Sequence, residues 1–316
     1  MESTTSIPKT KKTLNWSSPV KRLFDNPVIL KELRGRMRGR QAFMLLTVYL
    51  GLIAFFIMLA YNLLGLTNSI TWDPSARQSA GKIIFGTVVL LELLLLSFIA
   101  PGLTAGAITS ERERQTFEIL RTTLLSARSL VLGKLGSAFS FLLLLILTAL
   151  PIQSLAFILG GVGLGEMIVS SLMLVVTAVF FCTLGIFFSS VMKRTLPATI
   201  SSYAAILASF LILVVIFFLI AYVESISYNS PSANALEYFL IGILWFLIST
   251  NPLMAAIMSE VILVENQSLF YTTNSLFGSS GPNFLPSPWI IYVLVYSFLT
   301  LVLILLSVYF VRRPDR

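Results

Sequence analysis

The stretch TSERERQTFEILRTTLLSARSLVLGK, residues 109–134, is a charged segment between two long apolar runs. Ser110 is followed three residues later by Glu113, a spacing that predicts a capping box at the start of a helix. Apolar residues recur at helical spacing at Phe117, Leu120, Leu124 and Leu125. The segment therefore predicts an amphipathic helix that either lies at a membrane surface or docks into the groove of a partner.

The composition indicates a membrane protein. The chain has 316 residues, of which 56% are hydrophobic and 11% are charged, whereas soluble domains carry about 25% charged residues. We expect an all-α polytopic membrane protein with one transmembrane domain over residues 25–316, preceded by a flexible cytoplasmic tail over residues 1–24. The first apolar run begins too far from the N-terminus for a cleavable signal peptide.

The residue types argue against chemistry on the chain itself. There is no histidine, which removes the commonest general base and metal ligand. The sequence has no GxxxxGK[ST], HExxH, CxxC or GxSxG motif, and the glycine-rich run at 160–165 lies between two apolar segments, where it predicts a turn. The single Cys182 excludes an intrachain disulfide. We therefore expect no catalytic residue, no metal site and no cofactor.

The net charge of +8 is distributed in clusters beside the apolar runs. These clusters precede the first run, occupy the 109–134 segment, and recur at Lys193–Arg194 and Arg312–Arg313. This pattern follows the positive-inside rule and places both termini in the cytoplasm. Nucleic acid is not expected as a partner, because the folded modules that present basic faces to it are absent.

Residues 26–40 predict an interfacial amphipathic helix. Pro27 suits the first helical position, and apolar residues follow at four-residue spacing. The residues of interest in this helix are Pro27, Lys31, Glu32, Arg34 and Arg38. We expect its basic residues to meet lipid headgroups, although a simple positively charged flank of the first span would show the same composition.

Six apolar runs are long enough to cross a bilayer, which takes about 20 residues. The predicted spans are residues 43–64, 83–108, 130–159, 167–192, 198–222 and 289–311. Pro101, Gly102 and Gly106 should loosen or kink the second span near its inner end.

Residues 223–288 carry four acids and no Lys or Arg, which places them outside the cell. The apolar part, 238–264, is interrupted at Asn251–Pro252. A seventh span would put Arg312–Arg313 outside, against the charge rule, and the break leaves two pieces too short to cross alone. We favour a re-entrant or surface-lying helical hairpin, which must pack against protein or a wet cavity.

Glu92 is the one ionisable residue well inside a predicted span. Such a residue is costly in lipid and suggests a function, here a proton or cation relay or a polar contact with substrate. The alternative is a hydrogen-bonded glutamate that joins neighbouring helices.

Two motifs resemble the permease subunit of bacterial ABC transporters of the type-2 (exporter) class. They are NPVILKELRGRMRGR, residues 26–40, and AGAITSERERQTFEILRTTLLSARSLVLGK, residues 105–134. The resemblance extends to the six-span layout and to residues 251–253. Such permeases usually have glycine where this chain has Gln115.

The resemblance implies a coupling helix over 110–125 that sits in a groove of a separate ATP-binding subunit. Its contact residues would be Glu111, Arg112, Glu113, Arg114, Gln115 and Glu118. It also implies a connecting helix over 26–40, an outer gate at Asn251 and Pro252, and pairing with a second permease copy or paralogue. ATP and Mg²⁺ would bind only to the partner subunit.

The sequence thus predicts a permease subunit of an ATP-driven exporter in the bacterial plasma membrane, and not an enzyme by itself. Two alternatives remain at this stage: an ion-coupled secondary carrier that uses Glu92, and a membrane scaffold that transports nothing. Spans rich in Leu, Phe and Ile suit amphipathic cargo and contact with lipid equally well.

Overall fold

The computed structural model describes residues 40–63, 74–116, 126–229, 235–266, 269–272 and 285–312. The helices are α3 (Arg40–Leu63), α5 (Pro74–Thr104), α6 (Thr109–Glu113), α8 (Ala127–Ile158), α9 (Leu164–Val191), α10 (Thr195–Asn229), α11 (Ala235–Thr250), α12 (Pro252–Asn266) and α13 (Pro288–Arg312). Strands β1 (Tyr271–Thr272) and β2 (Leu285–Pro286) form a small antiparallel pair. The predicted tail and the predicted interfacial helix, with Pro27, Lys31, Glu32, Arg34 and Arg38, lie outside the described residues.

Within the described residues, six helices are long and apolar enough to cross a membrane: α3, α5, α8, α9, α10 and α13. This confirms the predicted all-α polytopic membrane fold. Each helix begins one to nine residues before its predicted span. Helix α5 ends at Thr104, before the predicted end at residue 108. Pro101 lies within α5 and the chain leaves the helix three residues later, because proline weakens the helix at this point.

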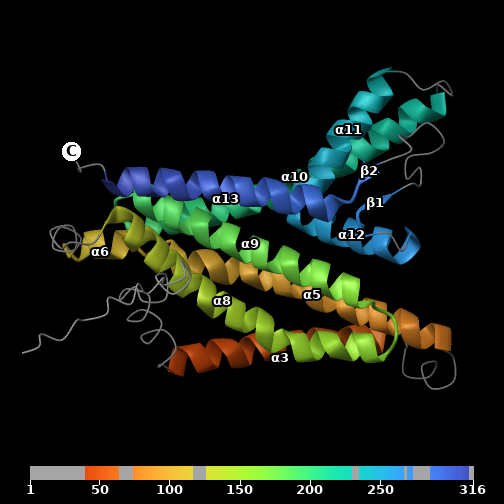
Figure 1. The fold of residues 1–316 in the computed structure, drawn as a ribbon, viewed down its shortest axis with the longest axis horizontal. Helices are drawn as coiled ribbons and strands as arrows, with labels where there is room; N and C mark the ends of the chain where they lie inside the picture. Colours follow the sequence, from red (N-terminus) through yellow and green to blue (C-terminus); the bar gives the residue numbers. More distant parts are fainter. Residues whose placement is uncertain are drawn as a thin grey trace, which may run out of the picture.

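Helix α9 is the centre of the bundle, packed against α5, α8, α10 and α13 (Figure 1). Its buried face is rich in small residues, and Gly185 lies so close to Thr104 that any side chain there would clash with α5. Helices α3 and α10 are different, because only 11% of each membrane-crossing window is buried. They present apolar faces that suit lipid or another apolar protein surface.

Helices α11 and α12 form a hairpin with a bend of 104° at Asn251. Both arms extend from the bend toward the end of the bundle opposite α6 (Figure 1). Helix α11 packs against α10 and α13, and α12 packs against α5, α9 and α13. The bend lies at the predicted break, Asn251–Pro252, and whether the two helices form a re-entrant hairpin or one broken span stays a prediction.

Candidate functional site

The first candidate site is the end of the bundle that carries α6, a helix of five residues that follows a turn after α5. Its N-cap is Ile108, and no side chain of its own caps it. The hydroxyl of Ser189 on α9 instead accepts hydrogen bonds from the backbone N–H of Ile108 (2.9 Å) and of Thr109 (3.1 Å). The predicted capping box is therefore wrong, since the helix begins before Ser110 and a side chain from α9 satisfies its first amides.

Three charged side chains of α6 contact other helices. Glu111 Oε1 lies 2.7 Å from the Nζ atom of Lys134 on α8, and Lys134 is only 4% exposed. Arg112 donates from Nη1 to the backbone carbonyl of Met192, at the end of α9 (3.1 Å). Glu113 Oε1 accepts hydrogen bonds from the backbone N–H of Thr195 (2.7 Å) and from its hydroxyl (3.0 Å), at the start of α10.

The helix ends immediately after these contacts. Arg114 is the C-cap, and Gln115 has a φ of +57°, in the left-handed region that favours glycine. The prediction of one continuous helix over 110–125 is therefore wrong, because a left-handed residue stops an α-helix. The resemblance described above implies a glycine at this position in related permeases, and glycine suits this backbone conformation. Residues 117–125, with Glu118, lie outside the described residues.

The tip of this segment, residues 114–116, differs from α6 in its exposure. Arg114, Gln115 and Thr116 are all exposed, whereas Glu111 and Arg112 are half-buried. The six predicted contact residues thus fall into different groups: Glu111, Arg112 and Glu113 join α6 to the rest of the protein, and Arg114 and Gln115 face outward.

The second candidate, Glu92, is completely buried on α5. Gln153 on α8 donates from Nε2 to Glu92 Oε1 at 3.0 Å. Buried beside them is Tyr49 on α3, which interacts electrostatically with Glu92. A polar contact between two apolar helices supports the interpretation of Glu92 as a residue that joins helices.

The third candidate is the bend between α11 and α12. Asn251 Oδ1 accepts hydrogen bonds from the backbone N–H of Leu253 and of Met254, both at 3.1 Å, so Asn251 caps α12. Its Nδ2 donates to the carbonyl of Ser209 on α10 at 2.8 Å. The hydroxyl of Tyr296 on α13 donates to the carbonyl of Thr250 at 3.0 Å. Pro252 occupies the first helical position, where its missing N–H costs nothing.

The chain matches the family model described as ABC-2 family transporter protein over residues 27–315. The chain belongs to the ABC-2 transporter family. The protein is accordingly the membrane permease of an ABC transporter. Permeases of this family are transport components and are not themselves catalytic. The family works in general with an ABC ATP-binding partner. A search of curated proteins found no match.

The sequence analysis missed the residues of this permease that hold α6 in place. Ser189 and Thr195 contact α6 from positions about 80 residues further along the chain. Ser189 lies in an apolar helix with no local pattern that marks it as a cap. Lys134 carried a weak signal, as a lone basic residue inside an apolar run, where a cation needs a partner.

Proposed function

We propose that this ABC-2 permease is driven by a separate ATP-binding subunit that docks on the segment beginning with α6, and that it works as an exporter. The observation that supports this proposal is that a helix of five residues is bonded to three long helices. Its side chains contact Lys134 on α8, the carbonyl of Met192 at the end of α9, and Thr195 on α10, while the backbone amides at its start donate to Ser189 on α9. A displacement of α6 should therefore be transmitted to all three helices.

The bonds suit the transmission of force. The pair of Glu111 with Lys134 is largely shielded from water, so salt screens it weakly. The two hydrogen bonds from Thr195 to the Glu113 carboxylate are charge-assisted, which makes them stronger than neutral ones. Because α9 packs in turn against α5 and α13, a movement of α6 reaches most of the described bundle.

The exposed residues that follow Glu113 make the contact with the ATP-binding subunit. In this proposal Arg114 and Gln115 touch the ATP-binding subunit, with Glu118 further along, while Glu111, Arg112 and Glu113 keep the tip aligned. ATP and Mg²⁺ bind on the partner. A second permease copy or paralogue covers the apolar faces of α3 and α10, which are the least buried of the six long helices. The basic clusters keep both termini and α6 in the cytoplasm.

The test is a charge reversal at the tip. Arg114→Glu, co-expressed with the ATP-binding subunit, should lower co-purification of that subunit and permease-stimulated ATP hydrolysis. Loss of one interfacial charge contact worth about 1.4 kcal/mol corresponds to roughly a tenfold weaker affinity. Arg77→Glu is the matched control, since Arg77 is also exposed but lies at the start of α5, at the opposite end of the bundle.

Arg77→Glu should change neither measurement. Co-purification and stimulated hydrolysis that survive Arg114→Glu unchanged would contradict the docking assignment. Transport of cargo by the purified permease without nucleotide would contradict the ATP-driven mechanism as a whole.

A further inference from the structure

A cleft of about 190 Å³ lies between α5, α9 and α12. It is separate from the α6 segment and from Glu92, which is not among the residues that line it. Most of its wall is apolar, with side chains from all three helices, among them Phe85, Val89, Leu93, Met173, Leu174 and Ile257.

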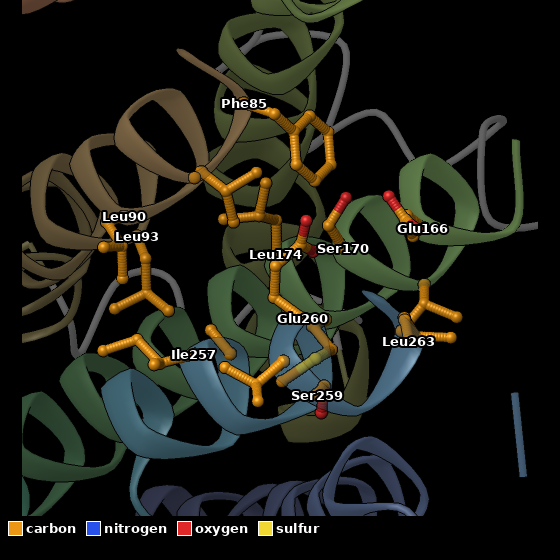
Figure 2. Close-up of a pocket in the computed structure, with 16 residues that line it drawn as sticks. Phe85, Leu90, Leu93, Glu166, Ser170, Leu174, Ile257, Ser259, Glu260 and Leu263 are labelled. Atoms are coloured by element: carbon orange, nitrogen blue, oxygen red, sulfur yellow. The ribbon is translucent and has the colours of Figure 1, made fainter. Parts of the chain in front are cut away.

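One side of the cleft is polar. Glu166 and Ser170 of α9 and Ser259 and Glu260 of α12 contribute to the wall. Figure 2 shows Glu166 and Ser170 across the cleft from Leu90, Leu93 and Ile257. The cleft is thus almost entirely apolar, with two carboxyl groups on one side of its wall, which is the pattern expected of a site for a mostly apolar molecule with one polar group.

The carboxyl groups of the cleft have acceptor capacity to spare. Glu166 Oε2 accepts a hydrogen bond from the backbone N–H of Gly163 at 3.2 Å. Glu260 Oε1 is buried and has no hydrogen-bond partner among the described residues. A buried acceptor without a donor is costly, so a donor placed in the cleft would stabilise it.

Three ionisable groups lie close enough to interact at the cleft. Glu166 and Glu260 interact electrostatically with each other, and both interact with Lys82 on α5. Burial disfavours the ionised form of both carboxyl groups, and a cation placed beside them would favour that form. A buried charge is stable only when it is paired, so the cleft favours a ligand with one positive charge.

We propose that this cleft binds a small cationic amphiphile, with its ammonium head at Glu166 and Glu260 and its apolar part among Phe85, Leu93 and Ile257. The volume limits the apolar part, because an apolar cavity of about 150 Å³ holds one benzene ring. The cleft therefore takes one short alkyl chain or a single ring, rather than a lipid with two long chains. This goes beyond the proposed function, since binding needs neither ATP nor the partner subunit.

The position of the site gives the ligand a means to act on the protein. Helix α12 is one arm of the hairpin, and its capped start at Asn251 is bonded to α10. A ligand that fills the cleft holds α12 against α5 and α9. Binding there should therefore raise the thermal stability of the permease, by an amount that grows with the logarithm of ligand concentration once that concentration exceeds the dissociation constant.

The experiment measures binding of n-hexylammonium to the full-length permease in detergent, by calorimetry and by thermal shift. Hexanol and hexanoate serve as ligands with the same chain and a neutral or negative head. We expect one hexylammonium per permease, at least tenfold weaker binding of hexanol, and no binding of hexanoate. Equal effects of the three compounds would indicate partition into apolar surfaces or detergent and would overturn the proposal.

Two variants separate the halves of the cleft. Glu260→Gln keeps the volume and removes the charge, and should weaken hexylammonium binding about tenfold. Gly86→Leu should abolish binding, because Gly86 lines the cleft and a side-chain atom added there meets no neighbouring atom within 4 Å. Leucine also favours the helix more than glycine does, so Gly86→Leu should fold.

The matched control is Glu92→Gln, the same change at a buried carboxyl group outside the cleft. It should leave hexylammonium binding unchanged. Unchanged binding in Gly86→Leu, or in Glu260→Gln, would place the ligand elsewhere and overturn the assignment. Because these measurements use the permease alone, their failure is distinct from a failure of the ATPase-docking proposal.

Discussion

Two of the breaks between helices in the described part of this permease, α5–α6 and α11–α12, are closed in different ways. Between α5 and α6, the amides of Ile108 and Thr109 are satisfied by Ser189, which belongs to α9. Between α11 and α12, the amides of Leu253 and Met254 are satisfied by Asn251, which stands at the break itself. One cap is tertiary and the other is local.

This difference between the caps determines how each break responds when the surrounding helices move. A local cap remains in place when the surrounding helices move, because it travels with the helix that it caps. A tertiary cap requires α6 and α9 to stay in register. The α6 break therefore links the stability of a short helix to the packing of the whole bundle, as the proposed coupling role requires. The cap of α12 does not depend on another helix, although Asn251 also donates to Ser209 of α10.

The largest effect should come from Ser189→Ala. This change removes the acceptor of two backbone N–H groups, those of Ile108 and Thr109. Both residues are fully buried, so water cannot replace the lost acceptor. At about 1–3 kcal/mol for each unsatisfied buried group, with partial relaxation, we expect a loss of about 3 kcal/mol in the free energy of unfolding. The measurement is unfolding of the detergent-solubilised permease by titration with dodecyl sulfate.

Ser190→Ala is the matched control for that variant. Ser190 is also buried, but its hydroxyl donates to the carbonyl of Phe187 in its own helix. Removing this bond leaves a carbonyl that already takes part in the helix, so the loss should stay below about 1 kcal/mol. Equal losses in the two variants would mean that Ser189 has no special role at the break.

The same contrast explains what sequence reasoning could predict. The six long helices follow from apolar runs of sufficient length, and the hairpin bend follows from adjacent Asn and Pro, which are local signals. The α6 segment was located correctly by its charges, but its capping box was wrong and its helix ends at Glu113. The first error concerns a contact with Ser189, far along the chain, which a local pattern cannot reveal. The second concerns the left-handed backbone of Gln115, because glutamine gives no local signal for that conformation.

The sequence also could not predict which side chains on different helices lie together. Glu92 was identified as a candidate, but its partner Gln153 lies 61 residues away on another helix. Glu166 and Glu260 are 94 positions apart by their numbers and are brought to one cleft only by the packing of α12 on α9. The sequence showed each of these residues singly, and the fold supplies the pairing.

A smaller effect is expected from Asn251→Ala at the local cap. Loss of an N-cap costs about 1 kcal/mol, and loss of the hydrogen bond to the Ser209 carbonyl costs about 1 kcal/mol more. We therefore expect a loss of about 2 kcal/mol in the free energy of unfolding, measured in the same way. Asn62→Ala is the control, because Asn62 is exposed and its amide donates to its own helix at Met58.

The order of the two expected losses in the free energy of unfolding, Ser189→Ala above Asn251→Ala, can be tested directly. If Asn251→Ala destabilises the permease more than Ser189→Ala does, the hairpin bend is the more tightly integrated of the two. The tertiary cap would then not be what couples α6 to the bundle. If Asn62→Ala costs as much as Asn251→Ala, the cap at the bend contributes nothing specific.

The smallest effect, and the only gain, is expected from Gln115→Gly at the end of α6. A side chain in the left-handed region costs about 1–2 kcal/mol, and glycine at φ +57° avoids this cost. Glycine also makes the unfolded chain more flexible, which offsets about 0.4–1 kcal/mol of the gain. The expected net increase is about 0.5 kcal/mol in the free energy of unfolding, and Thr116→Gly, at the exposed neighbour, should lower it instead.

The variant Gln115→Gly distinguishes a role of Gln115 in the stability of the permease from a role in binding the ATP-binding subunit. If Gln115 serves only to end the helix, glycine should preserve or improve both stability and stimulated ATP hydrolysis. If its exposed side chain contacts the ATP-binding subunit, stability should rise while co-purification falls. A strained residue is retained at a site when its side chain has a use that glycine cannot supply, so a fall in co-purification would explain why this permease has glutamine at a position suited to glycine.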